Sequence, residues 1–304
     1  MKLQTTLVAA LVLGLAAPAF AQDGFRVGIQ AGSMKTTGEA ASFAYTQQTS
    51  GPIQSVNGHN FDQATQSPLS LDLAWVKGDD EWSLTFFTTK KKTSQTLMDP
   101  ANGVFLAVFP FSLADAGLTG SRELKATIID LNWKHTLIKG DTGSFAFSAG
   151  LRSSQVSDER TYQQLDAGGA PNNTNIHMKG KGAGFGLTAG LHGRMNFNER
   201  FWMTTGFTAA MLNNTNKTDD YTLSGSGPSA TFSNDDVHQS LLQTDAYLRF
   251  NMNFVKSFNG YLGYEVRNFG TDNGKIKNAY TDLGLPTTSG FGLAGFTLGV
   301  SYTF

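Results

Sequence analysis

Residues 296–304 read Phe-Thr-Leu-Gly-Val-Ser-Tyr-Thr-Phe, and the stretch alternates apolar or aromatic residues with small or polar ones at every step. Side chains alternate across a β-strand with period two, so the even-numbered residues share one face and the odd-numbered residues share the other. The pattern therefore predicts a strand that lies between two different environments, one apolar and one polar.

An alternating strand that ends on an aromatic residue at the C-terminus resembles the closing strand of bacterial outer-membrane β-barrels. In such barrels this strand also carries the signal that the barrel-assembly machinery reads. The resemblance implies that the assembly signal consists of the outward-facing residues Phe296, Leu298, Val300, Tyr302 and Phe304.

The N-terminal residues have the pattern of a secretory signal peptide. Lys2 gives a positive start, residues 7–17 form an apolar segment, and Ala19-Phe20-Ala21 fits a cleavage site. The apolar segment is too short to span a bilayer, and no stop-transfer pattern follows it, which disfavours a retained anchor. We therefore expect residues 1–21 to be removed and residues 22–304 to form the barrel in the outer membrane of a Gram-negative bacterium.

Composition excludes several other classes of protein. The chain has 23 Lys and Arg against 24 Asp and Glu, so it lacks the basic excess of a nucleic-acid-binding protein. Mean hydropathy is −0.21, and no apolar run after the signal approaches the roughly 20 residues of a membrane helix. Low mean hydropathy and short apolar runs do not exclude a β-barrel, because only alternate residues of its strands face lipid. Without cysteine there is no disulfide framework.

Ten segments show the two-residue alternation, and they predict an all-β, antiparallel, up-and-down transmembrane barrel with both termini on the periplasmic side. The segments are residues 24–34, 68–77, 82–92, 123–138, 144–156, 182–197, 201–212, 239–254, 260–269 and 291–304.

The connections between these segments are alternately short and long. This is expected when tight turns face the periplasm and larger loops face outside. The short connections are 78–81, 139–143, 198–200 and 255–259, and the long ones are 35–67, 93–122, 157–181, 213–238 and 270–290. The apolar run 104–111 could hide a further strand, although Pro110 disfavours an interior one.

Aromatic residues gather beside the short turns, and all four tryptophans are among them: Trp75, Trp82, Trp133 and Trp202. Amphipathic rings favour the headgroup level of a membrane, so we expect a periplasmic aromatic girdle. The alternative is that these tryptophans belong to an ordinary globular core.

Several strand motifs resemble those of the Legionella-type major outer-membrane protein family of pore-forming barrels. The similarity covers residues 120–304 and is carried by residues 128–133 (IIDLNW), 147–152 (FSAGLR), 182–187 (GAGFGL) and 260–266 (GYLGYEV). Asn132 departs from the family pattern, where we would expect an acidic residue. The resemblance implies a narrow, porin-like channel for passive diffusion of small hydrophilic solutes or ions.

Residues opposite the lipid-facing positions should line the lumen: Arg26, Gln30, Asp72, Asp130, Asn132, Lys134, Arg152, His192, Arg194, Asp245, Arg249, Glu265 and Arg267. A slight basic excess among them would favour anions. An ion-paired plug that only stabilises the barrel is the alternative, because an unpaired ion away from water is costly.

Neither the size of the barrel nor the presence of small inward residues decides between a channel and an ion-paired plug. About eight strands give an interior just filled by side chains, so ten give a narrow one. Many predicted inward positions are nevertheless small, and they leave room for long side chains or for water: Gly184, Gly186, Thr188, Gly190, Thr204, Gly206, Thr208, Gly295, Thr297, Gly299 and Ser301.

Two other functions remain as alternatives to a channel. The long loops, two of them rich in Asn, Thr, Gly and Asp, would suit adhesion or a structural role in the envelope. A protease is less favoured. Asp236 and His238 have the spacing of an orienting acid and a general base, but no second aspartate pair is evident at the opposite rim.

We expect no enzyme activity, no cofactor and no metal site. Outer-membrane lipid, lipopolysaccharide and the assembly machinery are the expected partners. The sequence does not indicate whether copies of the chain associate.

Overall fold

The computed structural model describes residues 24–38, 42–50, 53–60, 65–99, 104–106, 116–224, 230–232, 237–255, 257–270 and 291–304. The expected signal peptide, residues 1–21, lies outside these ranges. Within them, no helix is long and apolar enough to cross a membrane.

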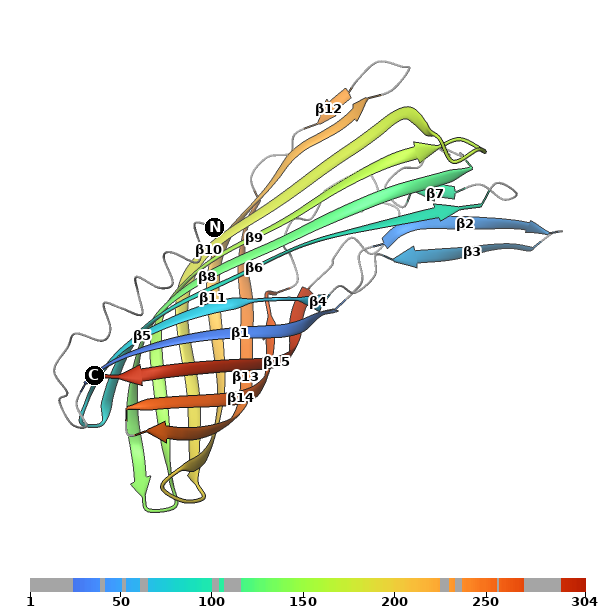
Figure 1. Ribbon diagram of the computed structural model, residues 1–304. Coiled ribbons are helices and arrows are strands. Elements are labelled where there is room, and N and C mark those ends of the chain that lie inside the picture. The colour runs from blue at the N-terminus through green and yellow to red at the C-terminus, as the bar shows by residue number, and fades with distance from the viewer. Residues whose placement is uncertain are drawn as a thin grey trace.

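Ten antiparallel strands form a closed ring, as the sequence predicts (Figure 1). In order along the chain they are β1 (Gly24–Gly38), β5 (Leu69–Lys77), β6 (Asp80–Met98), β8 (Gly117–Gly140), β9 (Gly143–Leu165), β10 (Pro171–Asn196), β11 (Phe201–Ser224), β13 (Val237–Val255), β14 (Phe258–Asn268) and β15 (Phe291–Thr303). Each strand pairs with its neighbours along the chain, which is the up-and-down topology.

The terminal strand closes the ring against the first strand. β15 pairs with β1 from Arg26 opposite Thr303 to Gly38 opposite Phe291. The backbone N–H of Phe304 also donates to the carbonyl of Phe25 at 2.9 Å. The alternating stretch that ends the chain therefore leaves no open edge in this part of the barrel.

Smaller strands lie beside the ring. β4 (Thr65–Gln66) pairs with β1, and β12 (Ala230–Phe232) pairs with β11. β2 (Ser42–Ser50), β3 (Ile53–Asn60) and β7 (Val104–Leu106) form a separate three-stranded sheet. The apolar run 104–111 thus does contain a short strand, but β7 pairs with β2 and does not enter the ring.

The prediction of a long loop at residues 157–181 is wrong, and two other long connections are shorter than predicted. β9 and β10 continue until only residues 166–170 connect them, so most of the expected 157–181 loop is a hairpin. β6, β8 and β11 likewise extend into the expected loops 93–122 and 213–238. The sequence here is mostly polar, but each strand has a long neighbour that pairs its backbone, and this outweighs the loop-like composition.

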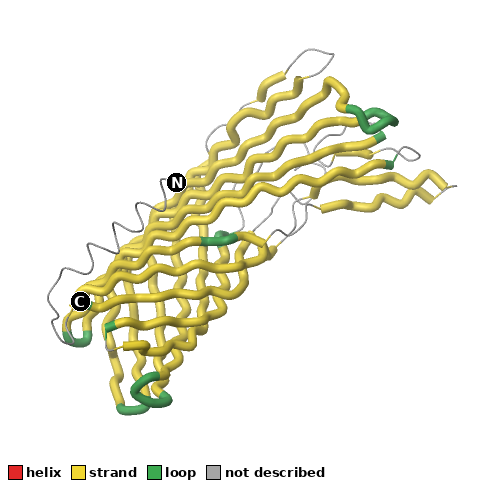
Figure 2. Tube along the Cα trace, in the orientation of Figure 1, coloured by secondary structure: helices red, strands yellow, loops and turns green. Residues whose placement is uncertain are grey.

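The prolonged strands form a sheet extension that stands on one side of the barrel only (Figures 1 and 2). It consists of β6, β8, β9, β10 and β11. β5 stops pairing with β6 at Leu69 opposite Thr88, whereas β8 accompanies β6 to Gly117 opposite Met98. In the described ranges, the part of β6 beyond Thr89 therefore has a strand neighbour on one side only.

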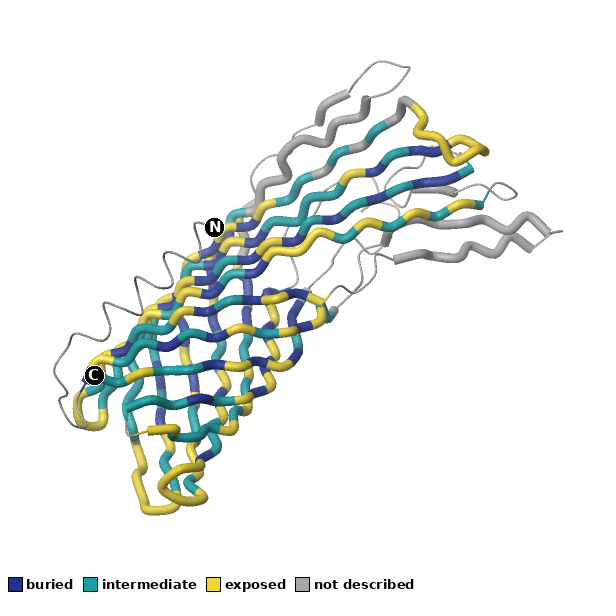
Figure 3. The backbone as a smooth tube through the Cα atoms, viewed as in Figure 1, coloured by how far each residue is buried: buried dark blue, intermediate teal, exposed yellow. Residues whose placement is uncertain are grey.

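Burial alternates along the strands, and exposed and buried residues follow one another around the ring (Figure 3). Leu131, Phe250 and Leu298 are 46%, 55% and 63% exposed, so these predicted lipid-facing residues do not form a central core. The outside of the ring is apolar, as a membrane-embedded barrel requires.

The aromatic girdle is only partly as expected. Trp75 and Trp82 are 50% and 49% exposed beside the first short turn. Trp202 is only 9% exposed and lines the lumen, where the guanidinium of Arg194 lies 4.7 Å from its ring. The reason is strand parity: Trp202 shares its face of β11 with Thr204, an inward residue.

Candidate functional site

The lumen contains a polar cavity of about 720 Å³ that reaches the short turns. All thirteen residues predicted to line the lumen lie on its wall: Arg26, Gln30, Asp72, Asp130, Asn132, Lys134, Arg152, His192, Arg194, Asp245, Arg249, Glu265 and Arg267. Turn residues such as Asp79 and Lys139 line it as well, so the cavity belongs to the half of the barrel that carries the short turns.

At the inner end of this cavity, Arg152 holds two aspartates from different walls. Its guanidinium donates to Asp130 at 2.7 and 2.8 Å, and to Asp245. Asp130 lies directly opposite Arg152 on the neighbouring strand β8, whereas Asp245 comes from β13, beyond β10 and β11. Arg152 is 1% exposed, so this triad is a buried link across the lumen.

A second arginine closes the lumen on the side of β13 and β14. Arg249 donates to Glu265 at 2.6 Å and to Gln30 of β1 at 3.2 Å. Its guanidinium lies between two tyrosine rings, 4.4 Å from that of Tyr247 and 4.6 Å from that of Tyr261. Together with the Arg152 triad, these groups form an ion-paired layer across the lumen.

The small inward residues provide space for these side chains. A Cβ on Gly206 would lie 2.4 Å from the ring of Tyr247, and one on Gly299 would lie 2.3 Å from that of Tyr261. A Cβ on Gly263 would lie 2.8 Å from Arg249. Two of the predicted small positions, Gly206 and Gly299, thus provide space for large side chains and not for water.

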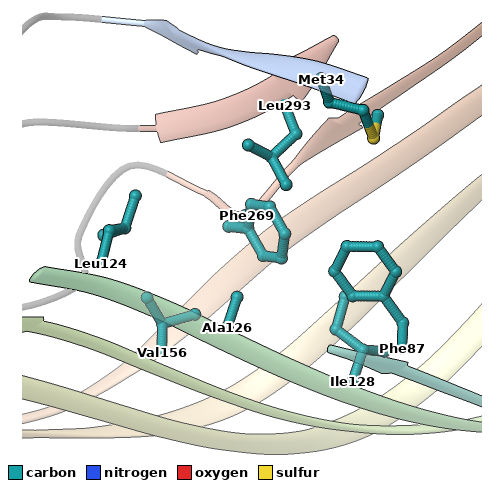
Figure 4. Packing of buried hydrophobic residues seen from close by; sticks show 8 residues of the cluster. All are labelled: Met34, Phe87, Leu124, Ala126, Ile128, Val156, Phe269 and Leu293. Carbon is teal, nitrogen blue, oxygen red and sulfur yellow. The ribbon is translucent and has the colours of Figure 1, made fainter. Parts of the chain in front are cut away.

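An apolar layer lies next to the ion-paired layer, on the side of the sheet extension. It comprises Met34, Phe87, Leu124, Ala126, Ile128, Val156, Phe269 and Leu293, each 5% exposed or less (Figure 4). Phe87 of β6 and Phe269, which follows β14, approach from opposite walls with ring centroids 6.3 Å apart. Arg267 connects the two layers, since its guanidinium lies 4.2 Å from the Phe87 ring and 3.5 Å from Glu265.

Closer to the short turns, the cavity wall has a more open polar network. Glu81 pairs with Arg26 and Lys134, each at 2.8 Å. His192 makes hydrogen bonds with Ser148 at 2.8 Å and with Tyr247 at 3.1 Å. Charged groups here are paired on one side and face the cavity on the other, so this half of the lumen is suited to water or ions.

Sequence reasoning missed the aromatic residues of the lumen. Tyr247, Tyr261, Phe87, Phe269 and Trp202 all face inward, and none was assigned there. The parity of each strand was sufficient to place them: Tyr247 lies between Asp245 and Arg249 on the inward face of β13. What parity does not give is which of these rings meet across the lumen.

A separate ionic cluster lies in the sheet extension, outside the barrel. Asp158 accepts hydrogen bonds from Arg122 at 2.8 Å and from Arg160 at 2.7 Å. Burial would raise the pKa of Asp158, but the two guanidinium groups outweigh it and hold this pKa well below its usual range. Burial raises the pKa of the neighbouring Tyr162 hydroxyl, which is 1% exposed.

The residues proposed for a protease are only partly within the described ranges. Asp236 lies outside them. His238 is exposed near the start of β13, and its Nδ1 lies 3.0 Å from the Thr215 hydroxyl. Among the described residues, no group of three His, Cys, Asp or Glu is arranged to hold a metal ion.

The fold and the lumen together define a ten-stranded barrel of the outer-membrane class. No family model and no curated protein matches the chain. Among solved structures, it is similar to the outer membrane protease OmpT from Escherichia coli, with 12% identity and a TM-score of 0.52 over 95% of this chain and 99% of that one.

Two further similar structures are bacterial outer-membrane barrels. The translocator domain of the autotransporter NalP from Neisseria meningitidis has 14% identity and a TM-score of 0.41 over 100% of this chain and 95% of that one. The toluene transporter TodX from P. putida has 10% identity and a TM-score of 0.35 over 93% and 90%. At these identities the likeness concerns the fold alone.

Proposed function

We propose that this chain is a bacterial outer-membrane barrel whose lumen is closed at rest, and that it acts through its sheet extension, in adhesion or as a structural component of the envelope. The proposal includes a cleaved signal peptide and recognition of the terminal aromatic strand by the assembly machinery. It also includes an orientation in which the short turns face the periplasm and the extension faces outside.

The observation that supports a closed lumen is the succession of two layers across it. A hydrophilic solute that enters the polar cavity meets the Arg152 triad and then the apolar layer. To pass, it would have to separate buried ion pairs and displace the rings of Phe87 and Phe269. Dehydrating an ion next to apolar side chains is costly, so passive flow through this conformation should be very small.

A narrow channel for small hydrophilic solutes or ions is the second candidate. It is favoured by the polar cavity of about 720 Å³ with charges of both signs on its wall. Membership of the Legionella-type family of pore-forming barrels stays a proposal that goes with this candidate. Conduction would require the apolar layer to open.

Single-channel recording of the refolded mature chain in a planar bilayer separates the two candidates. We expect no conductance steps from the wild type, and we expect steps from Phe87→Ala/Phe269→Ala, which removes the two rings that meet across the lumen. Phe86→Ala/Phe250→Ala is the matched control, because these phenylalanines are 39% and 55% exposed on the lipid-facing side. Regular steps from the folded wild type would refute the closed lumen and favour the channel.

A further inference from the structure

A row of lysines crosses the outer surface of the barrel where the sheet extension begins. Lys90 of β6 lies opposite Lys125 of β8, Lys125 lies opposite Ser157 of β9, and Ser157 lies opposite Lys181 of β10. We call these four residues the lysine row. Lys217 of β11 has the next position in the same register.

The lysine row continues the lipid-facing side of the barrel. Lys90, Lys125 and Lys181 are exposed, and each has the parity of the outward residues of its strand. An exposed apolar residue lies four residues along the strand from each lysine. Phe86 corresponds to Lys90, Ile129 to Lys125 and Phe185 to Lys181. The lysines therefore come directly after the apolar surface.

The lysine side chains of the row can reach the headgroup region of a bilayer. Four residues at about 3.3 Å each, on strands tilted by about 40°, rise about 10 Å above the last large apolar side chains. Each headgroup layer of a bilayer is about 5 to 7 Å thick, so the backbone of the row lies about 3 to 5 Å beyond it and the lysine side chains extend back into it. Because the row runs across tilted strands, it climbs about 3 Å per strand, and flexible lysine side chains can adjust to this slope.

Two lysines of the row are neighbours and carry the same charge. Lys90 and Lys125 are direct cross-strand neighbours, and like charges in this position repel. Glu123 pairs with Lys90 at 2.9 Å from the side away from the apolar surface. Lys125 has no ion pair with any residue in the described part of the chain.

The next row outward is mixed in charge. It contains Lys92, Glu123, Glu159 and Lys179 in one register. Glu159 pairs there with Lys179 at 3.2 Å and with His177 at 3.0 Å, and these partners lower its pKa, His177 most. On the outer face of these strands, the excess positive charge is therefore in the row nearest the apolar surface.

We propose that the lysine row binds the phosphate groups of an anionic lipid in the outer leaflet. A phosphate between Lys90 and Lys125 relieves their repulsion and accepts charge-assisted hydrogen bonds from both ammonium groups. The Ser157 hydroxyl lies beside Lys125 as a further donor. The inference rests on the membrane orientation proposed above, and it holds whether or not the lumen conducts.

The test is native mass spectrometry of the refolded mature chain in zwitterionic micelles, titrated with diphosphorylated lipid A. We expect Lys90→Gln/Lys125→Gln to bind about 30-fold more weakly than the wild type, at about fivefold per lysine near a charged surface. Lys77→Gln/Lys139→Gln removes the same charge from exposed positions at the short-turn end and should change binding less than twofold. Lys90→Arg/Lys125→Arg should bind like the wild type.

Two further arms complete the test. Inorganic phosphate at the same concentration should not compete, which distinguishes a lipid headgroup from free phosphate, and binding to the wild type should weaken as salt is raised. Equal losses in the two glutamine variants, or no loss in either, would overturn the proposal. Salt-independent binding would do the same. Heat-dependent migration on gels reports barrel folding separately, so failure of the barrel itself would be recognised.

Discussion

Replacing Arg152 by methionine tests whether the lumen is held closed by a buried ionic link. The substitution keeps most of the side-chain volume but leaves Asp130 and Asp245 without their shared cation. Their side chains are 8% and 15% exposed, and that of Arg152 is 2% exposed. Removing one partner of a buried ion pair costs about 3 to 5 kcal/mol.

Both aspartates also border the polar cavity, so water can hydrate them in part, and we expect the lower end of this range. A loss of about 3 kcal/mol corresponds to a change of roughly 150-fold in the unfolding equilibrium. The neutral triple variant Arg152→Met/Asp130→Asn/Asp245→Asn removes all three charges and should recover most of this loss, because replacing a whole buried ion group by neutral residues is often nearly neutral.

The assay is reversible urea unfolding in lipid vesicles, followed by tryptophan fluorescence, since Trp75 and Trp82 lie in the lipid-facing surface. The expected order of stability is wild type, then the triple variant close behind, then Arg152→Met. If Arg152→Met were within 1 kcal/mol of the wild type, the cavity would be hydrated well enough to solvate two free carboxylates. The buried-link reasoning would then be refuted.

Three other substitutions test separate parts of the account. Gly206→Ala places a Cβ 2.4 Å from the Tyr247 ring and should destabilise the barrel by about 1 to 3 kcal/mol, whereas Gly28→Ala, whose Cβ would have no neighbour nearer than 3.5 Å, should have little effect in the same urea assay. Asp158→Asn should destabilise the extension, as measured by hydrogen exchange of β9. Because the pKa of Asp158 is lowered in the folded state, the difference in stability from the wild type should persist from pH 7 to pH 5 and shrink only below about pH 4. A constant difference down to pH 2 would contradict the ionic account. Phe304→Ala should lower the amount of folded barrel in cells severalfold while refolding in vitro is unchanged, and equal yields from Phe304→Ala and wild type would remove the assembly signal.

Residue parity was enough to predict the ring of strands, and the reason is physical. Each strand of a barrel has lipid on one side and the lumen on the other, so the two-residue pattern of Phe296 to Phe304 recurs around the ring. The same parity places Arg152, Asp245 and Glu265 on the cavity wall. Local pattern and global fold agree wherever a strand touches lipid.

The sheet extension lacks this signal because its residues do not alternate between an apolar and a polar face. Residues 157–165 and 171–181 are mostly polar on both sides, and their strand structure depends on pairing between β8, β9 and β10. The contacts between side chains across the lumen could not be predicted from the sequence. Which side chains meet across it, such as Phe87 with Phe269, depends on strand tilt and stagger, which no local pattern records.

In the described part of the chain, β6 beyond Thr89 has a strand neighbour on one side only, and this has a consequence for association between molecules. A strand with free N–H and C=O groups along one side is a template onto which another chain can add, including another molecule of this protein. Residues 90, 91 and 92 on this border are three consecutive lysines, and all are exposed. When two molecules approach, the lysines of one repel those of the other. This repulsion disfavours edge-to-edge strand pairing between molecules, so the unpaired edge of β6 does not promote fibre-like association.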